Sequence, residues 1–183
     1  MSKFKTYLRA LEPGDLIYIN EWHNDETFFT YTMANKFYIS TERDKIWIKN
    51  LMTKDSDSIF WVICLRETDE MIGSTSLINI DLRNKKAYVG GITIDKKYQD
   101  LKLGFDAFDQ VLDYSFNELG LNKLSSGYLD SQLISAHALK KYGFVEELLL
   151  REEIYKLGKF HNVVVVSFLA SEYRAAMEKA NTK

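Results

Sequence analysis

Two kinds of hydrophobic pattern divide the chain into predicted strands and helices. Apolar runs rich in β-branched and aromatic residues predict strands, here over residues 6–10, 59–66, 71–80, 87–94, 123–129, 145–156 and 162–169. Apolar residues at helical spacing predict helices, here from residue 13, over 25–33, from 40 or 41, and over 103–119, 132–142 and 171–183. The pattern predicts an α+β fold, in which a mostly antiparallel mixed sheet of about six to seven strands carries helices on both faces.

The clearest of these helices covers residues 103–119. Its apolar face is formed by Phe108, Val111, Leu112, Ser115 and Leu119. Acidic residues and Asn117 lie on the opposite face, as expected for a helix that covers one side of a sheet. Gly120 follows directly and predicts the end of the helix.

Composition excludes several classes of protein. The chain has 183 residues, 46% of them hydrophobic, enough for one domain that we expect to span 1–183, with its core over 6–170 and a surface helix over 171–183. Lys and Arg number 24 and Asp and Glu 26, a balance that argues against nucleic-acid and membrane partners. Cys64 stands in an apolar run and the first residues lead into no signal-peptide core. We therefore expect a cytoplasmic protein.

The familiar patterns of metal and nucleotide sites are missing from the sequence. His23, His137 and His161 lie far apart, and none pairs with a cysteine or a second histidine at ligand spacing, so we expect no metal site. The sequence has no Walker motif, no Gly-x-Gly-x-x-Gly motif and no Gly-x-Ser-x-Gly motif. We assign no functional role to His137 or His161.

The junction over residues 92–104 is the best candidate for a binding site. A strand interrupted by Gly90 and Gly91 ends here, a short loop follows, and the long helix begins. The glycines predict a bulge or the close approach of a backbone or ligand. Free amides and the positive end of a helix dipole favour a phosphate group, and Lys102 adds a charge beside them. The alternative is an ordinary strand–loop–helix connection.

The order of these features resembles the Gcn5-related N-acetyltransferase (GNAT) family, from about Thr6 to Tyr173. More narrowly, it resembles the branch of ribosomal-protein alanine, spermidine and amino-sugar acetyltransferases. Gln99-x-x-Lys102-x-Gly104 falls on the pyrophosphate loop of that family. Lys141-x-Gly143-Phe144 resembles its Lys-x-Gly-Phe ending, and residues 158–162 resemble the turn before the last strand of the branch.

The resemblance implies acetyl-CoA as the co-substrate. The residues that it assigns to the cofactor are Ile92, Thr93, Ile94, Gln99, Asp100, Leu101, Lys102, Leu103, Gly104 and Gln132. Four positions depart from the family pattern. Lys102 replaces a glycine and Gln132 an asparagine, while Val89 and Leu139 stand where a glutamate base and a tyrosine acid are usual.

The resemblance also places an acceptor site. Residues 20–25 resemble the Trp-x-Asn segment of the branch, so Glu21, Trp22 and Asn24, together with Asp81, are expected to bind the acceptor. His23 and Tyr88 are the candidates for proton transfer, because histidine titrates near neutral pH. The alternative for each of these residues is a surface or half-buried polar side chain without a catalytic role.

We expect an N-acetyltransferase acting on a primary amine: a protein N-terminus, a polyamine or an amino-sugar nucleotide. Two alternatives remain at this point. The chain could be a non-catalytic module that binds acyl-CoA or a partner, or a relative by fold alone whose Lys102 loop no longer accepts CoA. A homodimer is possible through the late strands, where residues 163–166 form an apolar run that also fits a buried central strand.

Overall fold

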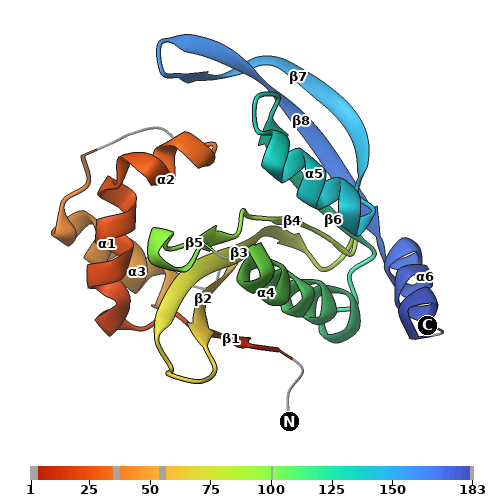
Figure 1. Ribbon diagram of the computed structural model, residues 1–183, viewed down its shortest axis with the longest axis horizontal. Helices are drawn as coiled ribbons and strands as arrows, with labels where there is room; N and C mark the ends of the chain where they lie inside the picture. The colour runs from red at the N-terminus through yellow and green to blue at the C-terminus, as the bar shows by residue number, and fades with distance from the viewer. Residues whose placement is uncertain (1–3, 35–37, 54–56, 100, 182–183) are drawn as a thin grey trace.

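The computed structural model describes residues 4–34, 38–53, 57–99 and 101–181. Its centre is an eight-stranded sheet with the order β1-β2-β3-β4-β6-β8-β7, to which β5 adds by pairing with β3 (Figure 1). The strands are β1 (Thr6–Ala10), β2 (Ile59–Leu65), β3 (Met71–Asp81), β4 (Lys86–Val89), β5 (Thr93–Ile94), β6 (Lys123–Leu129), β7 (Val145–Lys156) and β8 (Lys159–Leu169). Only β4 and β6 pair in parallel among these described strands, so the mostly antiparallel prediction is confirmed.

Helices cover both faces of the sheet, as the sequence predicted (Figure 1). They are α1 (Leu16–Asn24), α2 (Glu26–Tyr31), α3 (Thr41–Thr53), α4 (Leu101–Asp113), α5 (Leu133–Tyr142) and α6 (Ala170–Asn181). Strand β2 shows why two layers form. Its side chains alternate, so Val62 and Cys64 are buried against α1 and α3, while Ile63 is buried on the other side with Ala107 of α4.

The sheet opens between β4 and β6, and this opening determines where a ligand can enter. The two strands pair only from Lys86 to Tyr88, opposite Lys123 to Ser125. Beyond these residues β6 continues and pairs only with β8, whereas β4 ends at Val89. The predicted strand over 87–94 is therefore two short strands, which raises the strand count to eight.

The long helix is the other element that departs from its predicted form. The α-helix ends at Asp113, and a π-helical turn follows over Tyr114–Glu118. The hydroxyl of Ser115 donates to the carbonyl oxygen of Val111 at 2.6 Å, and the amide of Leu119 reaches the carbonyl of Tyr114 five residues earlier. A side-chain donor that takes an i−4 carbonyl competes with the regular helical bond, which explains the wider turn.

The C-terminal helix lies largely on the surface, as predicted for 171–183, but Ala170 and Tyr173 are buried. It begins at Ala170, and Tyr173 lies in the core, where its ring stacks on Phe116 with centroids 4.9 Å apart. Strand β8, just before it, pairs with β6 on one side and β7 on the other. The apolar run at 163–166 is thus a central strand. No helix among the described residues is both long and apolar enough to cross a membrane.

Candidate active site

A cavity of about 950 Å³ lies at the opening between β4 and β6. Its walls come from α1 and α2, the segment from Gly90 to Lys96, the first turns of α4, the end of β6, α5 and the β7–β8 hairpin. This volume is in the range of cofactor and small-molecule sites. The cavity brings together part of the 92–104 junction and part of the 20–25 segment, which are far apart in the sequence.

The wall at β5 combines close backbone packing with a free strand edge. A Cβ at Gly73 would lie 2.1 Å from the carbonyl oxygen of Thr93, so only glycine allows β3 and β5 to approach this closely. Ile92, Thr93 and Ile94 all line the cavity. Because β5 pairs with β3 alone among the described strands, the backbone groups along its other edge are available to a ligand.

The two glycines before β5 have different roles. The amide of Gly90 donates to the carbonyl oxygen of Ser76 at 2.8 Å, and a Cβ at Gly90 would lie 2.4 Å from the Ser76 hydroxyl. Gly91 has open space around its Cβ position and lines the cavity. The predicted close approach at this pair is confirmed for Gly90, whereas Gly91 leaves room for a ligand.

The beginning of α4 forms the next part of the wall. Gln99 and Gly104 line the cavity, and a Cβ at Gly104 would make only ordinary contacts with Ile92 and Ile94, at 3.7 and 3.9 Å. Leu101 is the first residue of the helix, so its amide is one of those without a partner inside the helix. Lys102 and Leu103 lie in the same turn but do not line the cavity. Asp100 lies outside the described residues.

Gln132 carries a polar group that lacks a partner. Its side-chain oxygen accepts a hydrogen bond from the amide of Leu129 at 3.0 Å. Its Nε2 group is buried and has no hydrogen-bond partner among the described residues, and the side chain lines the cavity. A buried donor without an acceptor is costly. The arrangement therefore fits a ligand that offers a carbonyl oxygen at this point, as the amides of the CoA pantetheine arm do.

The opposite wall holds three carboxylates around one ammonium group. Glu21, Asp25 and Asp95 line the cavity, and so does Lys96, whose Nζ donates to Asp25 at 2.9 Å. This hydrogen bond, and then the charges of Asp95 and Glu21, raise the pKa of Lys96. In turn the Lys96 contact, assisted by the amide of Thr27, lowers the pKa of Asp25 to about 2. The wall therefore already holds one primary ammonium group, that of Lys96.

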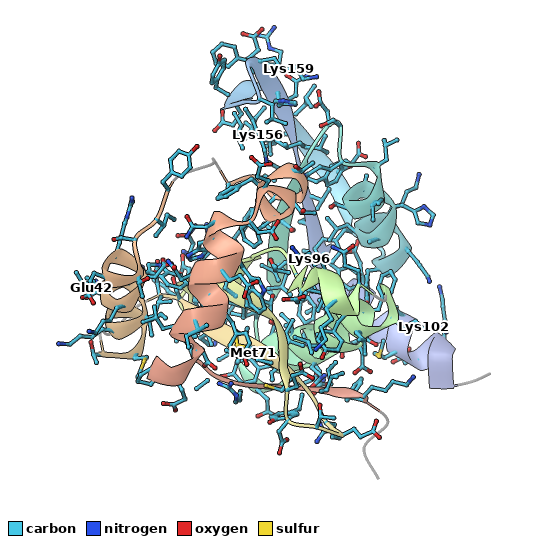
Figure 2. All side chains as sticks on the ribbon, turned by 60° about the vertical axis from the view of Figure 1, so that its left-hand side comes forward. Glu42, Met71, Lys96, Lys102, Lys156 and Lys159 are labelled. Carbon is cyan, nitrogen blue, oxygen red and sulfur yellow. The ribbon has the colours of Figure 1, made fainter. Side chains whose placement is uncertain are left out.

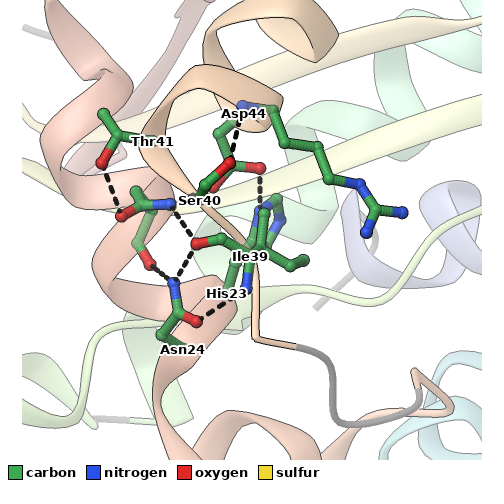
Figure 3. A network of polar contacts seen from close by, with 8 residues as sticks. His23, Asn24, Ile39, Ser40, Thr41 and Asp44 are labelled. Carbon is green, nitrogen blue, oxygen red and sulfur yellow. Dashed lines mark hydrogen bonds and ion pairs between the residues drawn. The ribbon is translucent and has the colours of Figure 1, made fainter.

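Asn24 and His23 belong to a polar network outside the cavity (Figure 3). Asn24 Nδ2 donates to the carbonyl of Ile39 at 3.0 Å, and its oxygen accepts from the Ile39 amide, also at 3.0 Å. His23 Nδ1 lies 2.8 Å from Asp44, a buried carboxylate of α3, and its ring packs on Trp47. The structure therefore places Trp22 in the cavity. Asn24 attaches the segment before α3 to α1, and His23 attaches α3 itself.

Tyr88 and Asp81 also lie apart from the cavity lining. The Tyr88 hydroxyl would be 2.6 Å from a Cβ at Gly127, so the ring packs behind the cavity wall at β6, and burial raises its pKa. Asp81 accepts hydrogen bonds from the amide and side chain of Asn84, at 2.8 and 2.6 Å. It shapes the turn between β3 and β4. Val89 is buried in the core and Leu139 lines the cavity, so neither usual proton-transfer position carries a titratable group.

Several titratable side chains in the cavity were missed in the sequence, among them Tyr142, Lys156 and His161. Tyr142 lies one helical turn after Leu139, and its hydroxyl contacts the Phe105 carbonyl and Asp109, each at 3.0 Å. Lys156 is buried and reaches the carbonyls of Phe29 and Thr32 at the end of α2. His161, given no role above, is buried and lines the cavity. Only Tyr142 had a signal, since helical spacing puts it on the face of Leu139.

Metal binding finds no support in the described part of the chain, where no three His, Cys, Asp or Glu side chains form a group able to hold an ion. Cys64 is buried between the sheet and the α1–α3 layer, away from the cavity.

Comparison with known proteins agrees with this geometry. The model of the acetyltransferase (GNAT) domain matches residues 5–145. A spermidine N(1)-acetyltransferase of Vibrio cholerae is 28% identical over 166 residues, which cover 91% of this chain and 94% of the relative. The uncharacterized N-acetyltransferase p20 of Bacillus licheniformis is 26% identical over 167 residues, 91% of this chain and 93% of that one.

A solved structure is also similar over nearly the whole chain. The crystal structure of spermidine N-acetyltransferase from Vibrio cholerae, in complex with CoA and spermine, superimposes with a TM-score of 0.85 at 26% identity. The match covers 93% of this chain and 98% of that one. With the free β5 edge, the start of α4 and the unpaired donor of Gln132 around one cavity, the chain belongs to the GNAT family of acetyltransferases, and it is an acetyl-CoA-dependent N-acetyltransferase rather than a non-catalytic module of that fold.

Proposed function

We propose that the acceptor is the primary amine of a polyamine such as spermidine. The observation that carries this proposal is the wall of Glu21, Asp25 and Asp95, which already surrounds a primary ammonium group, that of Lys96. The Lys96 side chain is 65% exposed, and ion pairs of exposed groups contribute little to stability. An acceptor ammonium can therefore displace it at small cost.

The charges of the cavity support a cationic chain bound along one wall. All three carboxylates belong to α1, the α1–α2 connection and the loop after β5, whereas Lys156 and Lys159 lie on the β7–β8 hairpin. A polycation is attracted to the first wall and repelled by the second. Two of the similar proteins are named as spermidine acetyltransferases, of Vibrio cholerae and Escherichia coli, and we extend that acceptor to this chain.

For the co-substrate we propose binding by the residues that line the cavity on the other side. They are Ile92, Thr93, Ile94, Gln99, Gly104 and Gln132. Acetyl-CoA supplies an acetyl group activated as a thioester. The chain's own contribution is to hold the acceptor nitrogen close to it, to keep it oriented and to exclude water, which accelerates a reaction between two bound groups. Glu21 and Trp22 would bind the acceptor, while Asn24 would act only through the position of α1.

The test measures turnover with a panel of amines, and the release of free CoA thiol is the readout. We expect spermidine to exceed an N-terminal peptide and an amino-sugar nucleotide by about tenfold or more in kcat/KM, about 1.4 kcal/mol of transition-state discrimination. The variant Glu21→Gln should raise KM for spermidine several-fold, while Glu67→Gln, in the β2–β3 turn outside the cavity, should not. A preference for the peptide or the sugar would overturn the polyamine assignment.

Two further features of the chain are proposed rather than established. Strand β7 and the β7–β8 hairpin expose several large apolar side chains: Val145, Leu148, Leu149, Tyr155, Leu157 and Phe160. We propose that β7, an edge strand, forms a homodimer contact through them. We also propose the cytoplasm as the compartment, consistent with a single buried cysteine in the reduced state.

A further inference from the structure

The reaction needs a proton acceptor, and neither position that usually carries out proton transfer in this family holds a titratable side chain. A primary amine is mostly protonated at pH 7 and must lose a proton before its lone pair can attack a carbonyl. The position of the usual glutamate is Val89, which is apolar and buried. The side chains that line the cavity must therefore contain the acceptor, or the proton passes directly to water.

Most titratable groups in the cavity are unsuited to this task. The carboxylate of Asp25 is a very weak base, because the Lys96 contact holds its pKa at about 2. Both oxygens of Asp95 are occupied, one by the indole of Trp22 and the other by the amide of Lys97, each at 2.8 Å. Glu21 is exposed to water on α1.

The remaining groups are donors. Lys96 donates to Asp25, which raises the pKa of Lys96. Burial lowers the pKa of Lys156, but its Nζ is held by the carbonyls of Phe29 and Thr32, and Lys159 is an exposed cation. Tyr142 keeps its proton, because burial and then Asp109 raise its pKa. Of the titratable side chains that line the cavity in the described part of the chain, this leaves His161, whose imidazole has a ring nitrogen that can accept a proton.

The backbone sets which nitrogen of His161 is free. Its Nε2 lies 3.2 Å from the carbonyl oxygen of Lys156. A carbonyl oxygen can only accept, so Nε2 must carry the hydrogen, and in the neutral ring the lone pair is then on Nδ1. Nδ1 has no hydrogen-bond partner among the described residues. The ring is only 8% exposed and lines the cavity, which leaves the cavity as the place from which Nδ1 can receive a proton.

The β7–β8 hairpin holds this ring on the acceptor side of the cavity. His161 pairs across the hairpin with Ile154, two residues before Lys156, whose Nζ donates to the carbonyls of Phe29 and Thr32 at the end of α2. Figure 2 shows Lys156 between the hairpin and α2, with Lys159 nearer the tip. Because Glu21 and Asp25 belong to α1 and the α1–α2 connection, next to α2, the ring and the ammonium site line the same cavity.

We propose that His161 is the proton acceptor of the reaction. This inference rests on the proposed function. Nδ1 takes one proton from the acceptor ammonium, and the nitrogen lone pair then forms the bond to the acetyl carbon. The carbon–sulfur bond breaks with its electron pair on sulfur, and the second nitrogen proton leaves to sulfur or to solvent. His161 returns its own proton to water, so the net products are the acetylated amine, free CoA thiol and one proton.

The variant His161→Gln tests the proposal, since its amide can still donate to the Lys156 carbonyl. We expect kcat for spermidine to fall about 10²–10⁴-fold, the usual contribution of a general base. Affinity for CoA, measured by calorimetry, and the midpoint of urea unfolding should stay within error of the wild type. His137→Gln, on the exposed face of α5, is the matched control and should leave all three values unchanged. His23→Gln shows whether the proton acceptor is His23, the candidate suggested by the sequence, or His161, which lines the cavity.

An acceptor of low basicity distinguishes proton removal from simple packing. An alkoxyamine is largely neutral at pH 7, so His161→Gln should cost it less than tenfold where spermidine loses at least a hundredfold. Equal losses for both amines, or full activity of the variant, would overturn the proposal. If the wild type prefers another amine to spermidine, the polyamine assignment fails, and the same pair of measurements on that amine still decides the role of His161. Absence of turnover with every amine would overturn both.

Discussion

The indole nitrogen of Trp22 donates a hydrogen bond to Asp95 at 2.8 Å, and this bond joins α1 to the loop between β5 and α4. Trp22 is buried on α1, and the other oxygen of Asp95 accepts from the Lys97 amide at the start of the turn before α4. The Asp25–Lys96 ion pair lies beside it. The loop between β5 and α4 is therefore attached at two points, by Trp22 to α1 and by Asp25 to the α1–α2 connection.

The variant Trp22→Phe should remove the hydrogen bond between α1 and this loop while it keeps an aromatic ring in place. Loss of the indole donor leaves one Asp95 oxygen unpaired, which we expect to cost about 1–2 kcal/mol of unfolding free energy. KM should rise for both substrates, because each wall loses its support. Urea unfolding and steady-state kinetics measure the two effects. Trp47→Phe, in α3 and outside the cavity, should leave both KM values unchanged.

The turn at Gly104 predicts opposite effects of two substitutions. Its Cβ position has room, so Gly104→Ala should fold normally and gain up to about 1 kcal/mol, as alanine favours a helix over glycine. Gly104→Glu should also fold, because the longer side chain can extend into the cavity that Gly104 lines. There its negative charge would oppose the CoA phosphates. Calorimetry should show CoA binding for alanine and none up to millimolar CoA for glutamate, and equal binding by both would refute this placement.

The buried, unpaired Nε2 group of Gln132 allows a test of how much one hydrogen-bond donor contributes to CoA affinity. Gln132→Glu keeps the oxygen that accepts from the Leu129 amide but replaces the buried Nε2 donor by a carboxylate oxygen. CoA affinity should fall at least tenfold, because a lost hydrogen bond is joined by a buried charge with no partner. Asn122→Asp, which replaces an exposed amide outside the cavity lining, provides the control. An unchanged dissociation constant would mean that Gln132 does not contact the cofactor.

The fold was largely predictable because its elements depend on local patterns. The helix at 101–113 has a strong apolar face, and Gly90 marks a close strand approach that a side chain would block. The break between β4 and β5 was harder to predict, since the hydrophobic pattern over 87–94 continues through it. The break reflects strand pairing, because β4 pairs with both β3 and β6 whereas β5 pairs with β3 alone, and a partner as distant in sequence as β6 leaves no local signal.

The site was harder to predict, because it depends on which way neighbouring side chains point. Consecutive residues on a helix differ in direction by about 100°, so Trp22 enters the cavity while His23 turns to Asp44 of α3. The resemblance of residues 20–25 to a family segment could not separate the two. His161 reaches the cavity only because the β7–β8 hairpin lies across it, and its sequence neighbours carry no pattern that indicates this.

The ion pair at the cavity entrance predicts how stability depends on pH. Asp25 caps α2 through the Thr27 amide at 2.6 Å and pairs with Lys96, so its pKa falls to about 2 in the folded chain, against an ordinary value near 4. A carboxylate with a lowered pKa stabilises the fold above its unfolded pKa and loses that effect as pH falls through the folded value. Asp25→Asn should therefore be less stable than the wild type at pH 7, and the difference should shrink between about pH 4 and pH 2. Urea unfolding across this range measures it. Asp57→Asn, of an exposed carboxylate just before β2, should show no such convergence, and a difference for Asp25 that stayed constant with pH would contradict the role of the ionised pair.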